Sequence, residues 1–292
     1  MGACSGGYRG RMADIRDARR DDLDAAYDLL AAAERAATGI AEVTRTELAH
    51  WWDSEDVSRY VSDTGGYGAI NTAGELVVAG ASPDEMLAQL EQRAREIGLP
   101  HVTAIVTGGD APFDALVRRA GYVQRGEVLR MWRLLDGDLP EPAWGNGVTV
   151  RTYEPDDATR VAALLDDAYS SWDDTYVARP LDAWVEWMTA HEDFDPALWF
   201  LAERGDELVA CGLHWRPTQG RGWVKDLVVR ADQRGTGLGK ALLYHGFRAN
   251  AQHGAGRVGL KVDSTNPTGA VQLYERTGFE IDRRYAIWLK PL

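Results

Sequence analysis

The chain has 292 residues, of which 45% are hydrophobic and 26% are charged. This composition is typical of a soluble globular protein and excludes a largely disordered one, and the length is sufficient for two domains with separate cores. The net charge of −13 argues against a nucleic-acid partner, because contacts to phosphates need a basic surface. An acidic balance is compatible with a cationic small molecule such as an amine, although it also serves simple solubility.

Membrane, disulfide and metal signals are weak in this sequence. No stretch approaches about 20 uninterrupted apolar residues, and residues 1–11 lack the apolar region of a secretory signal, so we interpret them as a disordered tail. Cys4 and Cys211 give no disulfide framework, and the six histidines show no pair at metal-ligand spacing. We therefore expect a cytoplasmic protein with no metal and no membrane partner.

The first half of the chain shows a recognisable but incomplete pattern. A helical pattern follows Asp21-Asp22, and a hydrophobic run at 76–80 leads into a turn that has no glycine cradle. Asp84 and Glu85 in that turn would repel a phosphate group. A strand that carries Trp132 closes this half.

The second half has a clearer periodicity, with alternating strands and amphipathic helices. We predict, in this order, a strand at 148–152, helices at 158–169 and 181–190, strands at 198–203, 207–215 and 223–230, a helix at 239–253, a strand at 258–262, a helix at 268–277 and a final strand near 284–289.

The two halves begin and end alike. Arg16 with the acidic pair that follows it matches Arg151 at an offset of 135 residues (151 − 16), and residues 116–122 match residues 273–279 at an offset of 157 (273 − 116). We therefore predict one fold in tandem. The predicted parts are a domain at 12–137, a linker rich in Pro, Gly and acidic residues at 138–146, and a second domain at 147–292.

A glycine-rich turn follows the predicted strand at 223–230. It contains Gly235, Gly237 and Gly239 and runs directly into a helix. Glycines let the backbone turn sharply and present its N–H groups, and a helix N-terminus favours negative charge. The turn therefore predicts a phosphate site.

This turn and a second motif together resemble the GNAT superfamily of N-acyltransferases, which use acyl-coenzyme A. Arg234, Gly237 and Gly239 match that family's (Gln/Arg)-x-x-Gly-x-(Gly/Ala) signature, and the second motif runs from Asn266 to Phe279. The resemblance is specific from about residue 199 to 285 and weaker upstream. It implies an α/β fold with two tandem domains, each with a mixed, mostly antiparallel central sheet flanked by helices.

The resemblance also implies an activity. It indicates an N-acetyltransferase that transfers an acetyl group from acetyl-CoA to the primary amine of a small molecule, such as an amino sugar, an antibiotic or a metabolite. The alternative from another class is a non-catalytic acyl-CoA-binding protein. We expect no nucleic-acid partner, and a monomer or a homodimer.

By the same resemblance, backbone amides of the strand before the turn contact the pantetheine arm and the thioester, with Val229 as the best position for the carbonyl oxygen. Asn266 contacts pantetheine, and its alternative role is a helix N-cap. The expected cofactor-binding residues are Leu227, Val228, Val229, Arg234, Gly235, Thr236, Gly237, Leu238, Gly239, Lys240 and Asn266.

Two catalytic residues are expected. Tyr274 matches the family tyrosine that protonates the departing thiolate, and its alternative role is a packed aromatic ring. Family members often place a glutamate where this chain has Trp223, so Asp226 is the nearest carboxylate for a base. Regular strand alternation places Asp226 on the face opposite Trp223, which leaves a water chain or a carboxylate of the 170–176 loop as alternatives.

The 170–176 loop carries aromatic and acidic residues together. Trp172, Asp173 and Asp174 suit a cationic amine through cation–π contact and ion pairing, and the family uses this region for the acceptor. In the first half, Val117 stands where the second half has Tyr274. We interpret the first half as a structural partner that shapes the substrate cleft, with a second acyl-CoA site as the alternative.

Overall fold

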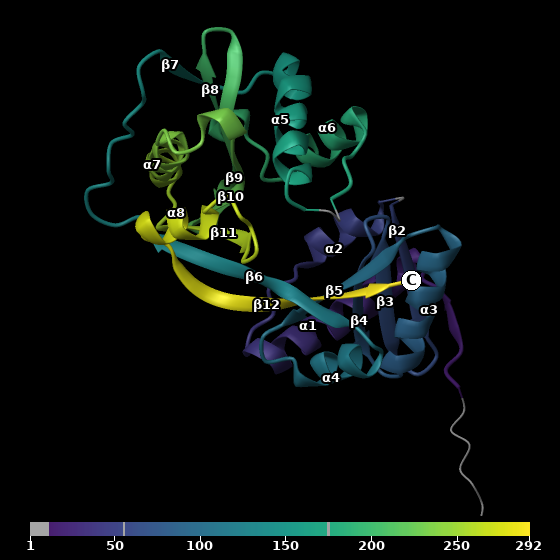
Figure 1. Cartoon of the computed structure of the whole chain (residues 1–292). Helices are drawn as coiled ribbons and strands as arrows, with labels where there is room; N and C mark the ends of the chain where they lie inside the picture. Colours follow the sequence, from purple (N-terminus) through teal and green to yellow (C-terminus); the bar gives the residue numbers. More distant parts are fainter. Residues whose placement is uncertain (1–11, 55, 174–175) are drawn as a thin grey trace, which may run out of the picture. The chain divides into compact units, whose positions relative to one another are not determined.

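The computed structural model describes residues 12–54, 56–173 and 176–292. These residues form two compact units, each with helices on both faces of a sheet (Figure 1). Unit 1 comprises the residues up to Gly126 together with Tyr285–Leu292, and unit 2 comprises Glu127–Arg284. Among the helices described, none combines the length and the apolar character that a membrane crossing requires.

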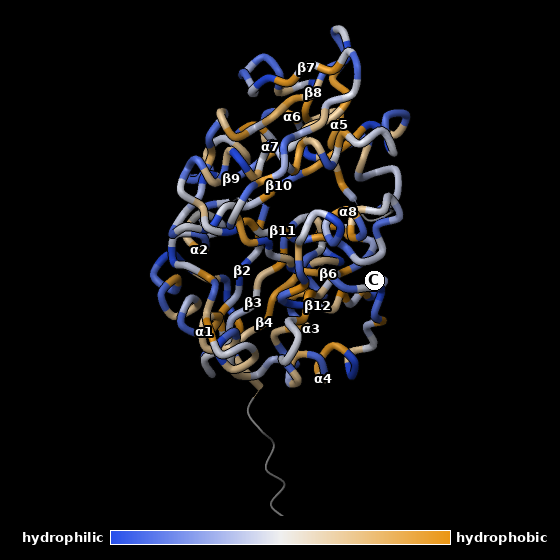
Figure 2. Tube along the Cα trace, turned by 90° about the vertical axis from the view of Figure 1, so that its left-hand side faces the viewer, coloured by the Kyte–Doolittle hydropathy of each residue, from blue (hydrophilic) through white to orange (hydrophobic). Residues whose placement is uncertain are grey.

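Unit 1 has the strand order β1-β2-β3-β4-β5-β12, in which only the β4–β5 pair is parallel. One face of its sheet is covered by α1 and α2 and the other by α3 and α4. Figure 2 shows β4 largely in orange, as expected for a strand with both faces buried. The elements are β1 (Ile15–Asp17), α1 (Leu23–Thr38), α2 (Arg45–Trp52), β2 (Val57–Ser62), β3 (Gly66–Asn71), β4 (Glu75–Gly80), α3 (Pro83–Glu96), β5 (His101–Thr107), α4 (Ala111–Arg119) and the end of β12 (Glu280–Pro291).

Unit 2 has the strand order β6-β11-β10-β9-β8-β7, in which only the β10–β11 pair is parallel. Helices α5 and α6 cover one face, and α7 and α8 cover the other. The predicted order of elements is confirmed. The elements are β6 (Val123–Leu134), β7 (Val148–Thr152), α5 (Ala158–Ser170), α6 (Leu181–Thr189), β8 (Trp199–Arg204), β9 (Glu207–Thr218), β10 (Arg221–Val229), α7 (Leu238–Gln252), β11 (Arg257–Asp263) and α8 (Ala270–Arg276).

Each unit takes its last strand from the other half of the sequence. Residues 128–134 of β6 pair antiparallel with β11 in unit 2, and residues 285–291 of β12 pair antiparallel with β5 in unit 1. The compact units therefore differ from the predicted ranges 12–137 and 147–292. The two exchanged strands occupy equivalent places in the repeat.

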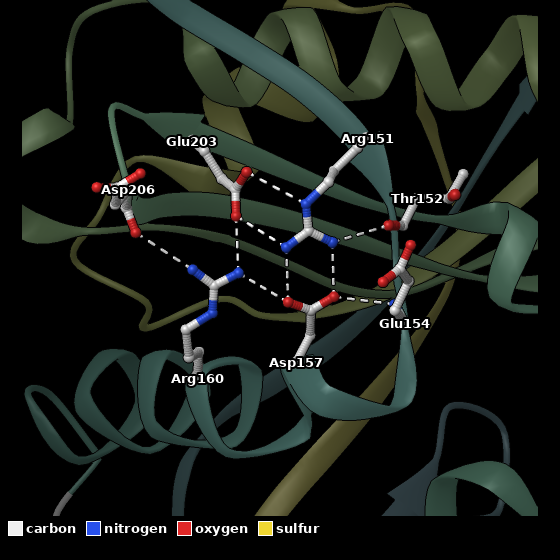
Figure 3. A network of polar contacts seen from close by, with 7 residues as sticks. All are labelled: Arg151, Thr152, Glu154, Asp157, Arg160, Glu203 and Asp206. Carbon is white, nitrogen blue, oxygen red and sulfur yellow. Dashed lines mark hydrogen bonds and ion pairs between the residues drawn. The ribbon is translucent and has the colours of Figure 1, made fainter.

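The start of the repeat is visible in four equivalent hydrogen bonds. In unit 2, Arg151 donates both terminal nitrogens to Asp157 (2.6 and 2.6 Å) and one of them to Thr152 O, while the Glu154 N–H donates to Asp157 (Figure 3). In unit 1, Arg16, Asp17, Arg19 and Asp22 make the same four bonds, each displaced by 135 residues. The first offset found in the sequence therefore has a structural basis.

The end of the repeat is equally regular. In unit 1, the N–H groups of residues 120, 121 and 122 donate to the carbonyl oxygens of residues 116, 118 and 117, respectively. In unit 2, residues 277, 278 and 279 donate to residues 273, 275 and 274. Each of the three donor and three acceptor residues in unit 2 has a number that is 157 higher than that of its equivalent in unit 1. Gly121 and Gly278 both have positive φ (85° and 89°), which glycine adopts without strain.

Asp157 is the centre of a larger ionic cluster in unit 2, since Arg160 and Glu203 join it to Arg151 (Figure 3). Hydrogen bonds from Arg151 hold the pKa of Asp157 below its usual range, against the opposing effect of burial. We expect Asp157→Asn to lower the free energy of unfolding by roughly 2 kcal/mol at neutral pH, because hydrogen bonds to a charged group are lost.

A carboxyl group whose pKa is lowered in the folded state stabilises the protein at pH values above its unfolded-state pKa. This stabilisation is lost as the pH falls through the folded-state pKa. The difference in the free energy of unfolding between wild type and Asp157→Asn should therefore have its full size at pH 7. It should become smaller as the pH falls well below about 4. Thermal unfolding across this pH range measures it. The adjacent exposed Asp156→Asn is the control, and an equal effect of both variants would contradict the role of the cluster.

Candidate active site

Strands β10 and β11 separate after a short parallel contact. Only Arg221–Trp223 of β10 pair with β11, whereas β10 stays paired with β9 as far as Val229. Within the described residues, the rest of the β10 edge that faces β11 has no strand partner. Backbone groups of Leu227, Val228 and Val229, predicted to contact the thioester arm, therefore belong to a strand with one open edge.

A β-bulge interrupts β10 where the two strands separate. Val224 pairs with His214, but the next residue of β9, Leu213, pairs with Asp226. Lys225 is thus an additional residue on β10 with no counterpart on β9. A bulge of this kind bends the strand and changes the direction of the side chains that follow.

The bulge places Asp226 and Trp223 on the same face of the sheet. Trp223 is paired with Trp215, and Asp226 with Leu213, and both partners belong to the core beneath α5 and α6. The prediction from regular alternation, which put Asp226 on the opposite face, is wrong because alternation assumes an uninterrupted strand. Asp226 therefore lies on the face of Trp223, the position at which the sequence resemblance led us to expect a glutamate.

Trp223 itself has a packing role. Its ring meets Trp132 edge-on, with 5.6 Å between ring centroids. A Cβ at Gly259 would lie 2.7 Å from Trp223 and 2.8 Å from Trp132, so that only glycine fits between the two indoles. This position contributes bulk and no carboxylate.

Asp226 lies on β10 and Tyr274 on α8, and the two interact electrostatically within unit 2. Both are 7% exposed. Burial raises the pKa of Tyr274 above its ordinary value, and the negative charge of Asp226 raises it further. The phenol is therefore protonated at neutral pH, and its hydroxyl has no hydrogen-bond partner among the described residues.

Two side chains that sequence reasoning missed contact Asp226. The Tyr169 hydroxyl donates to Asp226 Oδ1 at 2.6 Å, and Lys225 Nζ lies 3.1 Å from Asp226 Oδ2. Tyr169 is the last residue of the predicted helix 158–169, and no role was predicted for its side chain. The bulge turns Asp226 toward α5, and only this change of direction brings the carboxylate within hydrogen-bond distance of the Tyr169 hydroxyl.

The glycine-rich turn forms an open cradle. Gly235 and Gly237 have φ of 76° and 93°, and a Cβ at either would meet no atom within 4 Å. In the part of the chain that the structure describes, the N–H groups of residues 235–240 have no backbone acceptor, and α7 has no side-chain N-cap. Free donors at an uncapped helix N-terminus suit a pyrophosphate group.

The other residues of the turn hold its shape or remain exposed. Arg234 Nε donates to Val229 O at 3.2 Å, and Thr236 Oγ1 donates to Gln233 O at 2.6 Å. Lys240 is exposed on the first turn of α7. Leu238 and Gly239 are buried, and a Cβ at Gly239 would lie 3.1 Å from Leu273 Cδ2, which explains the close packing of α7 on α8.

Asn266 forms a turn and leaves its amide group available. Its Oδ1 accepts from the N–H and the hydroxyl of Thr268 (2.9 and 2.5 Å). The N-cap of α8 is Gly269, so the alternative role of Asn266 as that helix cap is excluded. Its side-chain NH₂ has no partner among the residues described here by the structure, which is what a pantetheine contact requires.

The predicted acceptor loop at 170–176 is hydrogen-bonded to Tyr169 of α5. The N–H groups of Trp172 and Asp173 both donate to Tyr169 O (3.3 and 3.0 Å). Tyr176 stacks on the Tyr169 ring at 5.4 Å and donates its hydroxyl to Asp166 at 2.6 Å. Asp174, also predicted for the substrate, lies outside the described residues.

Comparison with known proteins gives a consistent result. Residues 159–279 match the Acetyltransferase (GNAT) family model. A mycothiol acetyltransferase from Streptomyces coelicolor is 38% identical over 179 residues, which cover 59% of this chain and 56% of that protein. A mycothiol acetyltransferase from Geodermatophilus obscurus is 32% identical over 240 residues, which cover 75% of this chain and 74% of that protein.

A solved structure is similar over nearly the whole chain. The crystal structure of a GCN5-related N-acetyltransferase from Sphaerobacter thermophilus is 25% identical, with a TM-score of 0.73 and coverage of 96% of this chain and 95% of that one. In sequence, by contrast, the chain spans little more than half the length of the first curated relatives, with 56% of the Streptomyces coelicolor protein matched.

Proposed function

Because the chain belongs to the GNAT family of acetyltransferases, we propose that it transfers an acetyl group from acetyl-CoA to the primary amine of a small molecule. The observation that carries this proposal is the combination of a strand with an open edge, β10, which bears the carboxylate of Asp226, and a protonated phenol, Tyr274, on which the charge of Asp226 acts. Acyl transfer to an amine needs one group that accepts a proton and one that donates it.

The cradle and the open strand edge would hold acetyl-CoA. The N–H groups of residues 235–240 would bind the pyrophosphate, and Asn266 would donate its amide to the pantetheine arm. Backbone groups of 227–229 would bind along the arm, with Val229 at the thioester oxygen. A backbone donor fixed before the reaction stabilises the charge that develops on that oxygen.

The chemistry of the chain then follows from two side chains. Asp226 accepts the proton of the incoming amine, and Tyr274 donates its own proton to the sulfur that leaves. Burial raises the pKa of Tyr274, and the phenol therefore stays protonated until the carbon–sulfur bond breaks. The remaining candidates for the base are a water chain and a carboxylate of the 170–176 loop. Neither lies on β10 on the same face as Trp223, as Asp226 does.

The acceptor is proposed to be a cationic amine. Trp172 and Asp173 lie in the loop tied to Tyr169, and aromatic and acidic groups together favour a cation. The relatives named as mycothiol acetyltransferases make an amino-sugar conjugate the first compound to test, and an antibiotic or metabolite amine the second. We also propose a cytoplasmic monomer or homodimer that acts without nucleic acid, membrane or metal.

Unit 1 is proposed to be a structural partner without a cofactor. The turn after β4 is short, and α3 begins with Pro83, which has no N–H group to offer. Asp84 and Glu85 occupy the first turn of that helix. The Ala81 N–H is already bonded to Gly65 O at 3.1 Å, so this turn offers fewer free donors than the cradle in unit 2, and its two carboxylates oppose a phosphate.

Gly237→Asp should abolish acetyl-CoA binding. The variant forces a side chain onto a residue with φ of 93° and brings a negative charge into the cradle. Calorimetry should give one acetyl-CoA per chain for the wild type and none for Gly237→Asp, and the ligand-induced rise in Tm should disappear with it.

Gly254→Asp is the matched control, because Gly254 is an open glycine with φ of 85° just beyond the other end of α7. It should bind acetyl-CoA like the wild type. A retained Tm shift in Gly237→Asp would refute the cradle, and a stoichiometry of two would refute the structural role of unit 1. Thiol release with a panel of amines, followed with DTNB, separates an acetyltransferase from a non-catalytic acyl-CoA-binding protein.

A further inference from the structure

The two oxygens of Asp226 have different kinds of partner. Oδ1 accepts from Tyr169 at 2.6 Å, and Oδ2 faces Lys225 Nζ at 3.1 Å. Burial raises the pKa of Tyr169 well above its ordinary value, with a further rise from Asp226, so that its hydroxyl stays protonated at neutral pH and can donate. Lys225 is a flexible side chain that is 33% exposed and can move away.

Tyr169 also holds the acceptor loop through its backbone. Its carbonyl oxygen accepts from the N–H groups of Trp172 and Asp173, while its ring is stacked on Tyr176. The side chain of one residue therefore holds the carboxylate, and its backbone holds the loop. A shift of this residue would move both.

We propose that Tyr169 is a positioning residue that fixes Oδ1 of Asp226 and couples it to the acceptor loop, which leaves Oδ2 to take the proton from the amine. This inference rests on the proposed function. The amine approaches as a cation and takes the place of Lys225 against Oδ2. One N–H proton passes to Oδ2, the neutral nitrogen forms the new bond to the acetyl carbon, and the carbon–sulfur bond breaks as Tyr274 protonates the sulfur. The excess proton that remains on the nitrogen then returns to the Tyr274 oxygen, and Asp226 releases its proton to solvent before the next turnover.

The surroundings of Asp226 agree with this division. Tyr169 and Tyr176 face it from α5 and the loop, Tyr274 from α8, Cys211 from β9 and Lys225 from β10. The pKa of each of the three phenols and of the thiol is raised, so these four groups are neutral at pH 7. Lys225 is the one cation in this set, and the cationic acceptor amine would take its place beside Oδ2 of Asp226.

Tyr169→Phe tests the proposal, because it removes the hydroxyl and keeps the ring stack. We expect kcat to fall about 10- to 100-fold, which corresponds to the loss of a hydrogen bond to a charged group, with KM for acetyl-CoA unchanged. The loss should shrink as pH rises, since an amine that arrives deprotonated needs less help from a base. Tyr153→Phe is the control, because Tyr153 is a buried tyrosine of the same core without a bond to Asp226.

A second readout does not depend on activity. Amide hydrogen exchange at Trp172 and Asp173 should rise in both Tyr169→Phe and Asp226→Ala, since both variants break the same bond, and not in Tyr153→Phe. Wild-type kcat in Tyr169→Phe, a loss that is equal at every pH, or unchanged exchange at both amides would overturn the proposal. If the wild type releases no thiol with any amine, the proposed function fails, and the exchange result still decides the coupling.

Discussion

Tyr274→Phe is expected to lower kcat by about 10²–10⁴-fold, the usual contribution of general acid catalysis, while acetyl-CoA affinity changes little. The hydroxyl is needed only as the thiolate departs, so its loss removes an interaction of the transition state and little of the ground state. The ring is buried against Phe279, with 5.7 Å between centroids, and the variant keeps this packing. Steady-state kinetics and calorimetry on the same preparation measure both effects.

Tyr153→Phe again serves as the comparison, because it loses a buried tyrosine hydroxyl elsewhere in unit 2. Two results would contradict the role of Tyr274. One is full activity in a variant whose chemical step is shown to limit the rate. The other is a loss of cofactor affinity that accounts for the whole loss of rate, which would make Tyr274 a binding residue.

The tandem repeat was predictable because its signals are local. The arginine that starts each half and the glycine near its end are used for fixed hydrogen bonds, and these bonds recur at the offsets of 135 and 157 read from the sequence. The phosphate turn was predictable for the same reason, since Gly235 and Gly237 have the positive φ for which glycine is needed. Each of these features depends on a few neighbouring residues.

The exchange of β6 and β12 was not predictable from the sequence. Both strands are twelve residues long and both carry a tryptophan near the end. Trp132 lies against Trp223 in unit 2, whereas Trp288 lies in the core of unit 1. Since each strand is the repeat equivalent of the other, hydrophobic pattern alone cannot assign either to a sheet.

The bulge at Lys225 is the other feature that the sequence did not reveal. Alternation along β10 is a reliable guide only while each residue has one partner on β9, and a single added residue reverses the faces of all those that follow. The sequence-based doubt about Asp226 came from this one residue. Tyr169 was missed as a consequence, because its polar partner was placed on the wrong side of the sheet.

Asp226→Asn is expected to lower kcat by about 10²–10⁴-fold at neutral pH, as for the loss of a general base. Asparagine keeps the shape of the side chain and an oxygen that can accept from Tyr169, so the loop and the fold should be preserved. It cannot take up a proton, and the deficit in kcat should therefore decrease as pH rises and the free amine becomes abundant.

Asp173→Asn separates the alternatives for the base, because it removes the described carboxylate of the acceptor loop while Asp226 stays intact. If Asp173→Asn loses turnover in the pH-dependent way and Asp226→Asn does not, the base lies in the loop, and if neither variant loses turnover, a water chain carries the proton.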